Sequence, residues 1–169
     1  MAETLDPALP HTVQDKADKV LELACDQELM LATAESCTGG LLAALLTDVP
    51  GCSHAFERGF VVYTEEAKAQ LLDIDPARIE QLGAVSKEIA IDMAHGALRR
   101  SEADLALSIT GFAGPGKDGE EEGLVHLACA RRDGPTDHRC EHYGAIGRQG
   151  VRIASLETAL EMLEKALKA

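Results

Sequence analysis

Residues 29–46, LMLATAESCTGGLLAALL, contain the pattern that decides the fold. Residues 29–34 form a short apolar run, which predicts a buried strand. The turn AESCTGG follows, and apolar residues then recur at helical spacing until Pro50-Gly51, where the helix should end (Leu41, Leu42, Leu45 and Leu46). A buried strand that passes through a turn into a helix is the repeating unit of α/β proteins.

The rest of the chain continues this alternation. Further strands are predicted at residues 58–63, 104–110 and 124–130, and the turn Asp133-Gly134-Pro135 should fold residues 138–143 back as a hairpin. Helices should begin at the polar caps Thr12, Thr64, Asp75 and Ser86. The first helix should bury an apolar stripe formed by Val13, Ala17, Val20, Leu21 and Ala24. The last helix should bury a stripe formed by Ile153, Leu156, Leu160, Leu163 and Leu167. We therefore expect an α/β fold, a three-layer α/β/α sandwich with a mostly parallel mixed sheet of about five strands, one of them antiparallel.

The composition is that of a folded domain. The chain has 169 residues, of which 46% are hydrophobic and 3% aromatic. Such a hydrophobic fraction excludes a disordered chain, and so few aromatic rings disfavour a base-stacking platform for single-stranded nucleic acid. We expect a flexible leader at residues 1–10 and a single domain at residues 11–169.

Charge and cysteine usage restrict the partners and the compartment. The net charge of −13 argues against nucleic-acid and anionic-membrane partners, because such binding needs clustered Lys and Arg. No stretch approaches the roughly 18 consecutive apolar residues of a transmembrane helix, and residues 1–16 lack a signal-peptide pattern. The five cysteines contain no Cys-x-x-Cys pair, which favours reduced thiols and a cytoplasmic location.

The AESCTGG turn contains a candidate nucleophile, Ser36. Amides at the start of the following helix would stabilise an anion or an oxyanion, and Gly39 and Gly40 would let a ligand approach the backbone. Two alternatives remain open: Ser36 or Thr38 is only a helix cap, or Cys37 is the nucleophile instead.

Lys68 is the candidate base for Ser36, because no histidine lies in a pattern typical of a catalytic triad. In such folds ligands bind beyond the carboxyl ends of the strands, which places Tyr63 and Thr110 near the same crevice. To act near neutral pH, the pKa of Lys68 must fall from about 10.4 to about 7, which requires burial. Alternatively, Lys68 is a solvated surface lysine paired with a neighbouring glutamate.

Two other motifs resemble a P-loop and a metal site, but each lacks residues that such a site needs. The loop from Gly111 to Gly123 approaches a P-loop, but Asp118 stands where a magnesium-binding Ser or Thr is needed and no helix follows, so only a backbone-amide nest for a substrate oxygen remains. His138, Cys140 and His142 alternate along a predicted strand without a further ligand, so we expect no metal and no cofactor.

Arg148 and Arg152 lie four residues apart on one face at the start of the last helix. Cations are unfavourable at a helix N-terminus because its dipole is already positive there. Two arginines at this place are explained if they bind an anion such as a phosphate, or else they are exposed and paired with the abundant carboxylates.

Five blocks of the sequence resemble the CinA C-terminal domain family, whose stand-alone members are nicotinamide-nucleotide amidases. They are TAESCTGG (33–40), FERGFVVYTEEAKAQLL (56–72), LGAVS (82–86), SITGFAGP (108–115) and a GxxxVR ending around residues 148–152. The resemblance covers nearly the whole chain from about residue 29. It implies that residues 11–169 are a CinA C-terminal-like amidohydrolase domain.

The resemblance also implies an activity: hydrolysis of nicotinamide mononucleotide to nicotinate mononucleotide and ammonia, without a metal or cofactor. Residues that match the family's motifs take its roles: Ser36 nucleophile, Lys68 base, Tyr63 a helper that orients or relays protons, Arg152 a phosphate ligand and Arg148 its assistant. Thr110 would bind the reacting carbonyl or the substrate, and Thr38, Gly39, Gly40 and Gly111 are expected beside it.

Three hypotheses follow from these residues. The first is a Ser–Lys amidohydrolase that acts on a small-molecule substrate, and the sequence is compatible with a homo-oligomer of this enzyme. The second is a non-catalytic nucleotide-binding or partner-docking module of the CinA type, and the third is a thiol enzyme that uses Cys37. Glu121-Glu122 replaces a Lys-Pro pair that family members commonly carry, and this change would weaken anion binding near the loop.

Overall fold

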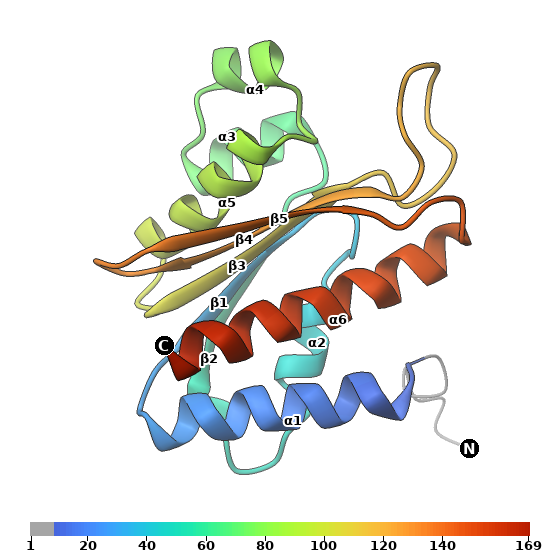
Figure 1. The fold of residues 1–169 in the computed structure, drawn as a ribbon. Coiled ribbons are helices and arrows are strands. Elements are labelled where there is room, and N and C mark those ends of the chain that lie inside the picture. Colours follow the sequence, from blue (N-terminus) through green and yellow to red (C-terminus); the bar gives the residue numbers. More distant parts are fainter. Residues whose placement is uncertain (1–8) are drawn as a thin grey trace, which may run out of the picture.

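The computed structural model describes residues 9–169, so the predicted leader at residues 1–10 lies almost entirely outside the described residues. A five-stranded sheet has helices on both faces (Figure 1). Its strand order is β2-β1-β3-β4-β5, and β4 runs antiparallel to both of its neighbours while the other four strands point the same way. The bounds are β1 Leu31–Glu35, β2 Phe56–Val61, β3 Leu105–Gly111, β4 Leu124–Arg131 and β5 Thr136–His142.

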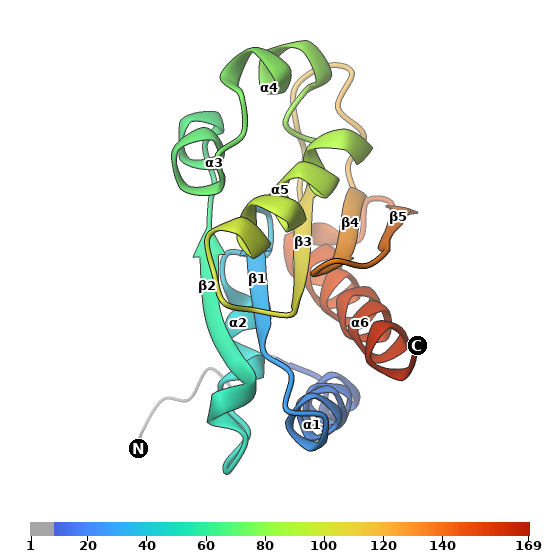
Figure 2. The same cartoon turned by 90° about the vertical axis from the view of Figure 1, so that its left-hand side faces the viewer.

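The helices form the outer two layers. On one face of the sheet lie α3 Glu65–Leu72, α4 Pro76–Leu82 and α5 Lys87–Arg99; on the other lie α1 His11–Asp26, α2 Leu41–Leu46 and α6 Gly147–Lys168 (Figures 1 and 2). A short 3-10 helix, η2 Ser53–Ala55, precedes β2. The predicted three-layer α/β/α sandwich with one antiparallel strand is therefore confirmed. Within residues 9–169, no helix has both the length and the apolar character needed to cross a bilayer.

The alternation of side chains along the central strands builds a separate core on each face. Leu105 and Leu107 of β3 pack with α1, α2 and α6, whereas Ala106 packs with α5. Small residues on the α5 side allow close packing there. Gly96 of α5 lies against the end of α3, and a Cβ at this position would come within 2.3 Å of the Leu72 carbonyl oxygen. This contact fixes the position of α3, the helix that carries Lys68.

Local sequence explains most of the element boundaries. The predicted caps Thr64, Asp75 and Ser86 each accept a hydrogen bond from a first-turn amide. The predicted cap at Thr12 is wrong: α1 begins at His11, because the Pro10 carbonyl already accepts from the amides of Val13 and Gln14. The predicted apolar stripe of α1 is confirmed as its buried face.

The second strand lies earlier in the chain than predicted, at residues 56–61 instead of 58–63. The register explains the difference, because Val61 pairs with Glu35, the last residue of β1, and the Val62 amide donates to the carbonyl of that same residue, so the pairing ends before Tyr63. These two residues instead lead the chain from the sheet to Thr64 at the start of α3. The shift places their carbonyl groups at the carboxyl edge of the parallel strands.

Candidate functional site

Ser36 lies directly after β1, at the carboxyl edge of the sheet. Its backbone amide donates to the Ile109 carbonyl of β3 over 3.0 Å, which fixes the residue against the central strand. Gly39 and Gly40 adopt positive φ values of 62° and 95°, so the tight turn into α2 needs residues without a Cβ. The Ser36 side chain is largely buried, with 7% of the residue exposed.

Glu35, which the sequence analysis missed, organises this turn. Its fully buried carboxylate accepts from the amides of Gly40 (3.2 Å), Leu42 (3.0 Å) and Ala43 (2.8 Å), and from the Thr38 hydroxyl (2.6 Å). A carboxylate at a helix N-terminus is stabilised by the helix dipole. The only sequence signal for this role is the acidic residue immediately before the serine turn.

This arrangement excludes one of the open alternatives and corrects one expectation. Neither Ser36 nor Thr38 caps α2. The residue at the cap position is Gly40, which has no side chain that could accept a hydrogen bond. The amides at the start of α2 are also not available to an oxyanion, because the Glu35 carboxylate already accepts from them.

Lys68 approaches Ser36 from the other side of the site. It lies on α3, only 1% exposed, and its Nζ is 3.1 Å from Ser36 Oγ. The same Nζ donates to the carbonyl oxygens of Val62 at 3.1 Å and Tyr63 at 3.3 Å. The alternative of a solvated surface lysine is therefore wrong for this structure.

Burial lowers the pKa of Lys68, and the nearby Cys37 and Glu65 raise it by smaller amounts. No carboxylate forms an ion pair with this ammonium group among the described residues. A neutral amine has two N–H groups and one lone pair, and the two carbonyl oxygens match the two N–H groups. The lone pair then faces Ser36 Oγ, so the arrangement suits removal of the serine proton.

The Ser–Lys pair opens into a cavity of about 240 Å³. Cys37 also lines it, but burial raises the pKa of the Cys37 thiol to about 11. A thiol with such a pKa stays protonated near neutral pH and is a poor nucleophile. The opposite wall is formed by residues 110–116, the end of β3 and the start of the glycine-rich loop, and Ala84 and Val85 lie between α4 and α5 on the same cavity.

Thr110 lies on β3 with its side chain in the cavity wall. Its residue is 1% exposed, and its hydroxyl donates to the Ala84 carbonyl over 2.8 Å. The hydroxyl proton is thus used, and the oxygen lone pairs can accept from a donor in the cavity. Gly111 beside it has no space for a side chain, since a Cβ there would lie 2.6 Å from the Leu124 carbonyl oxygen.

The two arginines occupy different places. Arg148 lines the cavity, with its Nη2 over Gly114, where an added Cβ would approach that atom to 3.1 Å. Arg152 is partly buried, and its Nε donates to the Cys37 carbonyl over 2.8 Å. The structure therefore brings Arg148, rather than Arg152, to the wall of the cavity, and it uses Arg152 to hold the serine turn.

The other expected site residues are divided between the cavity wall and the turn behind Ser36. Tyr63 lines the cavity with 65% of the residue exposed, and its contact with Lys68 is made by the backbone carbonyl. Thr38, Gly39 and Gly40 shape the turn behind Ser36 and do not line the cavity. Glu120, which the sequence analysis did not single out, also lines the cavity and places a negative charge in its wall.

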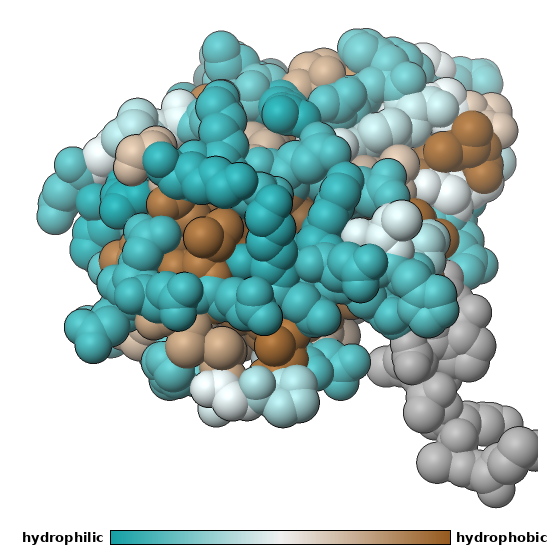
Figure 3. All heavy atoms as spheres, turned by 60° about the horizontal axis from the view of Figure 1, so that its bottom comes forward, coloured by the Kyte–Doolittle hydropathy of each residue, from teal (hydrophilic) through white to brown (hydrophobic). Residues whose placement is uncertain are grey.

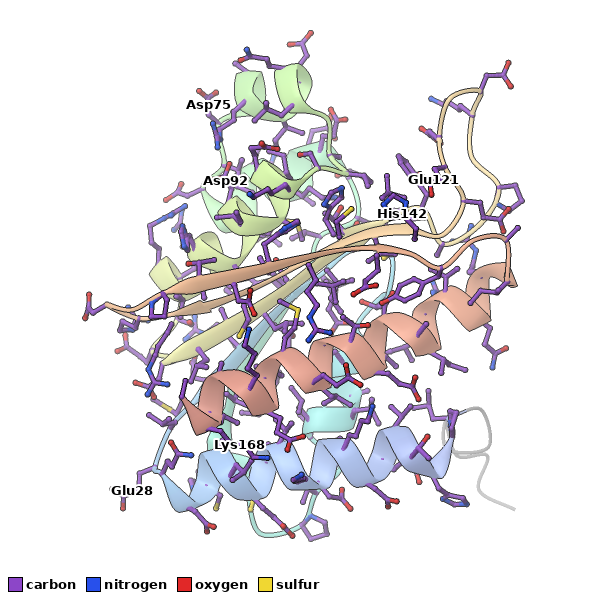
Figure 4. All side chains as sticks on the ribbon, viewed as in Figure 1. Glu28, Asp75, Asp92, Glu121, His142 and Lys168 are labelled. Atoms are coloured by element: carbon purple, nitrogen blue, oxygen red, sulfur yellow. The ribbon has the colours of Figure 1, made fainter. Side chains whose placement is uncertain are left out.

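The alternating residues of β5 contact one another and a neighbouring strand. His126 Nδ1 lies 3.1 Å from His138 Nε2, and His142 Nδ1 lies 2.7 Å from a carboxylate oxygen of Glu121 (Figure 4). Cys140 Sγ lies 3.6 Å from His142 Nε2. In the part of the chain that the structure describes, no group of three or more His, Cys, Asp or Glu side chains is arranged to hold a metal ion.

These features define the class of the protein. It is a three-layer α/β protein with a buried serine–lysine pair, located where the parallel strands of its sheet end. A family model, that of the CinA C-terminal domain, matches residues 13–167. The chain belongs to this family, which confirms the resemblance seen in the sequence.

Solved structures agree with the assignment. The competence/damage inducible protein CihA from Agrobacterium tumefaciens is 44% identical, and the match covers 95% of this chain and 98% of that one with a TM-score of 0.91. A competence or damage-inducible protein from Enterobacter asburiae is 33% identical over 92% of this chain and 98% of that one, with a TM-score of 0.86.

Curated relatives are longer than this chain. A CinA-like protein of Mycobacterium marinum is 46% identical over 152 residues, which is 89% of this chain and 35% of the relative. A CinA-like protein of Chlorobium phaeobacteroides is 41% identical over 179 residues, 99% of this chain and 42% of the relative. The chain thus spans about two-fifths or less of the length of these relatives.

Proposed function

We propose that this protein is an amidohydrolase that converts nicotinamide mononucleotide to nicotinate mononucleotide and ammonia. The observation that carries the proposal is the distance of 3.1 Å between Lys68 Nζ and Ser36 Oγ at the wall of a cavity. The substrate follows from the resemblance to the stand-alone family members. The chemistry follows from what a buried amine can do beside a hydroxyl group.

In the first half of the reaction, Ser36 Oγ attacks the carboxamide carbon while its proton moves to the Lys68 lone pair. The C–N bond then breaks, and Lys68 returns that proton to the leaving nitrogen, which departs as ammonia. Ser36 remains as an acyl ester. In the second half, water attacks the ester carbon, Lys68 accepts a proton from the water, and Ser36 Oγ leaves and recovers its proton.

The amide of Cys37 is the donor we assign to the oxyanion. Ser36 uses its own amide on Ile109, and the amides of residues 39–43 also donate within the turn and α2. In the described part of the chain, the Cys37 amide donates to no other residue's acceptor. It directly follows the nucleophile and belongs to a cavity-lining residue, which is the position that an oxyanion donor needs.

The rest of the cavity is suited to the two polar ends of the substrate. The Thr110 oxygen can accept from the carboxamide NH₂, which orients the reacting carbon toward Ser36. Arg148 supplies a guanidinium group for the phosphate, since it forms no ion pair within residues 9–169. Glu120 opposes anion binding in the same wall, so we assign the phosphate to the Arg148 side of the opening.

The test is release of ammonia from nicotinamide mononucleotide by the wild type and by Ser36→Ala and Lys68→Met. We expect both variants to lose activity by at least about 1000-fold, because each removes a partner of the proton transfer. Ser155→Ala is the matched control, since Ser155 is fully buried on α6 and its hydroxyl donates within that helix.

Two results would contradict the proposal. Activity that survives Ser36→Ala would exclude the serine mechanism. A rise in the melting temperature of the wild type with nicotinamide mononucleotide, without ammonia release, would instead indicate the nucleotide-binding module.

A further inference from the structure

Two cysteines lie close together at the end of the molecule opposite the candidate site. Cys25 is in the last turn of α1, and Cys52 is the residue before η2, which contacts α1. Both precede the amino ends of their strands, β1 and β2, whereas Ser36 and Lys68 lie at the carboxyl ends. The face that carries α1 is mainly hydrophilic (Figure 3).

The two thiols are accessible and interact with each other. Both residues are partly exposed, whereas Cys37 and Cys129 are buried. The pKa of the Cys52 thiol is raised, and the largest cause is its hydrogen bond with the Cys25 side chain. His54 completes the cluster from η2, with its Nε2 3.4 Å from Cys25 Sγ.

The surroundings of the two thiols differ. The Cys25 Sγ lies beside His54 Nε2, so the imidazole is placed to take up the thiol proton when Cys25 attacks an oxidant, whereas no such base contacts Cys52 among the contacts of the described residues. Burial and the carboxylates of Glu22 and Asp26 add to the rise in the pKa of Cys52, so that side chain stays a thiol. One cysteine is thus suited to react first with an oxidant and the other to react second.

We propose that Cys25 and Cys52 form a reversible disulfide when the protein meets a peroxide. The Cys25 sulfur attacks one peroxide oxygen while its proton passes to His54, the O–O bond breaks, and Cys25 becomes a sulfenic acid; the departing hydroxide or alkoxide takes up that proton and leaves as water or alcohol. The Cys52 sulfur then attacks the sulfenic sulfur, its proton joins the departing hydroxyl as water, and the S–S bond forms. The peroxide is reduced and the two cysteines are oxidised by two electrons.

Such a bond would enclose β1, the Ser36 turn and α2 within one covalent loop, because these elements lie between residues 25 and 52. A disulfide stabilises a fold mainly by restricting the unfolded chain. We expect the oxidised protein to melt roughly 5–10 °C above the reduced protein. The effect concerns the stability of the serine-bearing segment and does not depend on the proposed reaction.

The experiment treats the full chain with hydrogen peroxide and then blocks the remaining thiols for mass spectrometry. We expect the wild type to lose two hydrogen atoms and to yield a cross-linked peptide joining Cys25 to Cys52, which dithiothreitol reverses. Cys52→Ser should stop at a sulfenic acid on Cys25 that dimedone traps, and Cys25→Ser should form no disulfide. His54→Gln should slow the oxidation several-fold.

Cys140→Ser is the matched control, because Cys140 is exposed and also lies near histidines. It should oxidise like the wild type. A peptide map that joins other cysteines, or an untouched Cys25–Cys52 pair while Cys140 is oxidised, would overturn the proposal. Because the map is made on the wild type, a variant that fails to fold leaves the test intact.

Discussion

Replacing Glu35 by Gln tests the account of the serine turn most directly. The carboxylate accepts four hydrogen bonds, three at Oε2 and one from the Ala43 amide at Oε1. A glutamine keeps one acceptor oxygen, but its NH₂ group then faces the Ala43 amide, and two donors cannot bond. The substitution also removes the negative charge at the N-terminus of α2.

The magnitude follows from these two losses. A buried unpaired donor costs about 1–3 kcal/mol, and a lost charge at a helix N-terminus costs about 0.3–2 kcal/mol. We expect the free energy of unfolding to fall by about 2–4 kcal/mol, which lowers the melting temperature by roughly 5–15 °C. Amidase activity should fall as well, because the same turn holds Ser36.

The assay is urea unfolding followed by circular dichroism, with ammonia release measured on the folded fraction. Glu80→Gln on α4 is the control, since Glu80 is exposed and its substitution removes no buried acceptor. If Glu35→Gln unfolds within about 1 kcal/mol of the wild type and keeps full activity, the buried carboxylate does not organise the turn.

The other predictions concern the reaction. The value of kcat/KM should rise with pH through the Lys68 pKa, because only the neutral amine accepts a proton. The charge on Glu65 raises that pKa, so Glu65→Gln should move the rising limb of the pH profile to lower pH. A pH profile that does not move would contradict this prediction. Glu66→Gln, one residue further along α3, should leave the profile in place. Arg148→Gln should raise KM for the nucleotide about 10-fold or more with a smaller change in kcat, and an equal effect on the corresponding riboside would exclude a phosphate contact. Cys37→Ala should retain most of the activity, since the Cys37 pKa of about 11 keeps the thiol protonated; loss of activity together with survival in Ser36→Ala would indicate a thiol enzyme.

Local sequence rules predicted the helices and strands of this fold well, because helix caps and apolar periodicity depend on residues that are close together in the chain. The caps Thr64, Asp75 and Ser86 accept hydrogen bonds from amides two or three residues ahead, so a short window of sequence reveals them. The end of β2 was misplaced because it depends on its register with β1, which no local pattern encodes.

The site was predictable to a different degree. Ser36 and Lys68 came from strand ends and from the family resemblance, and the structure places their reactive atoms within hydrogen-bond distance. Glu35 was missed because a strand residue that caps the next helix through its carboxylate falls outside the usual cap position. The different positions of Arg148 and Arg152 depend on how α6 packs against the serine turn, which spacing along one helix cannot show.

The bond from the Ser36 amide to the Ile109 carbonyl has a consequence for refolding. Its two ends are distant in the chain, and contacts of that kind form late because a long loop must close first. Six-residue α2 is too short to persist alone in water and depends on the same assembled strands. Helical signal should therefore return before the proposed amidase activity when the denatured protein is diluted into buffer, since Ser36 reaches its position only once β1 has docked beside β3.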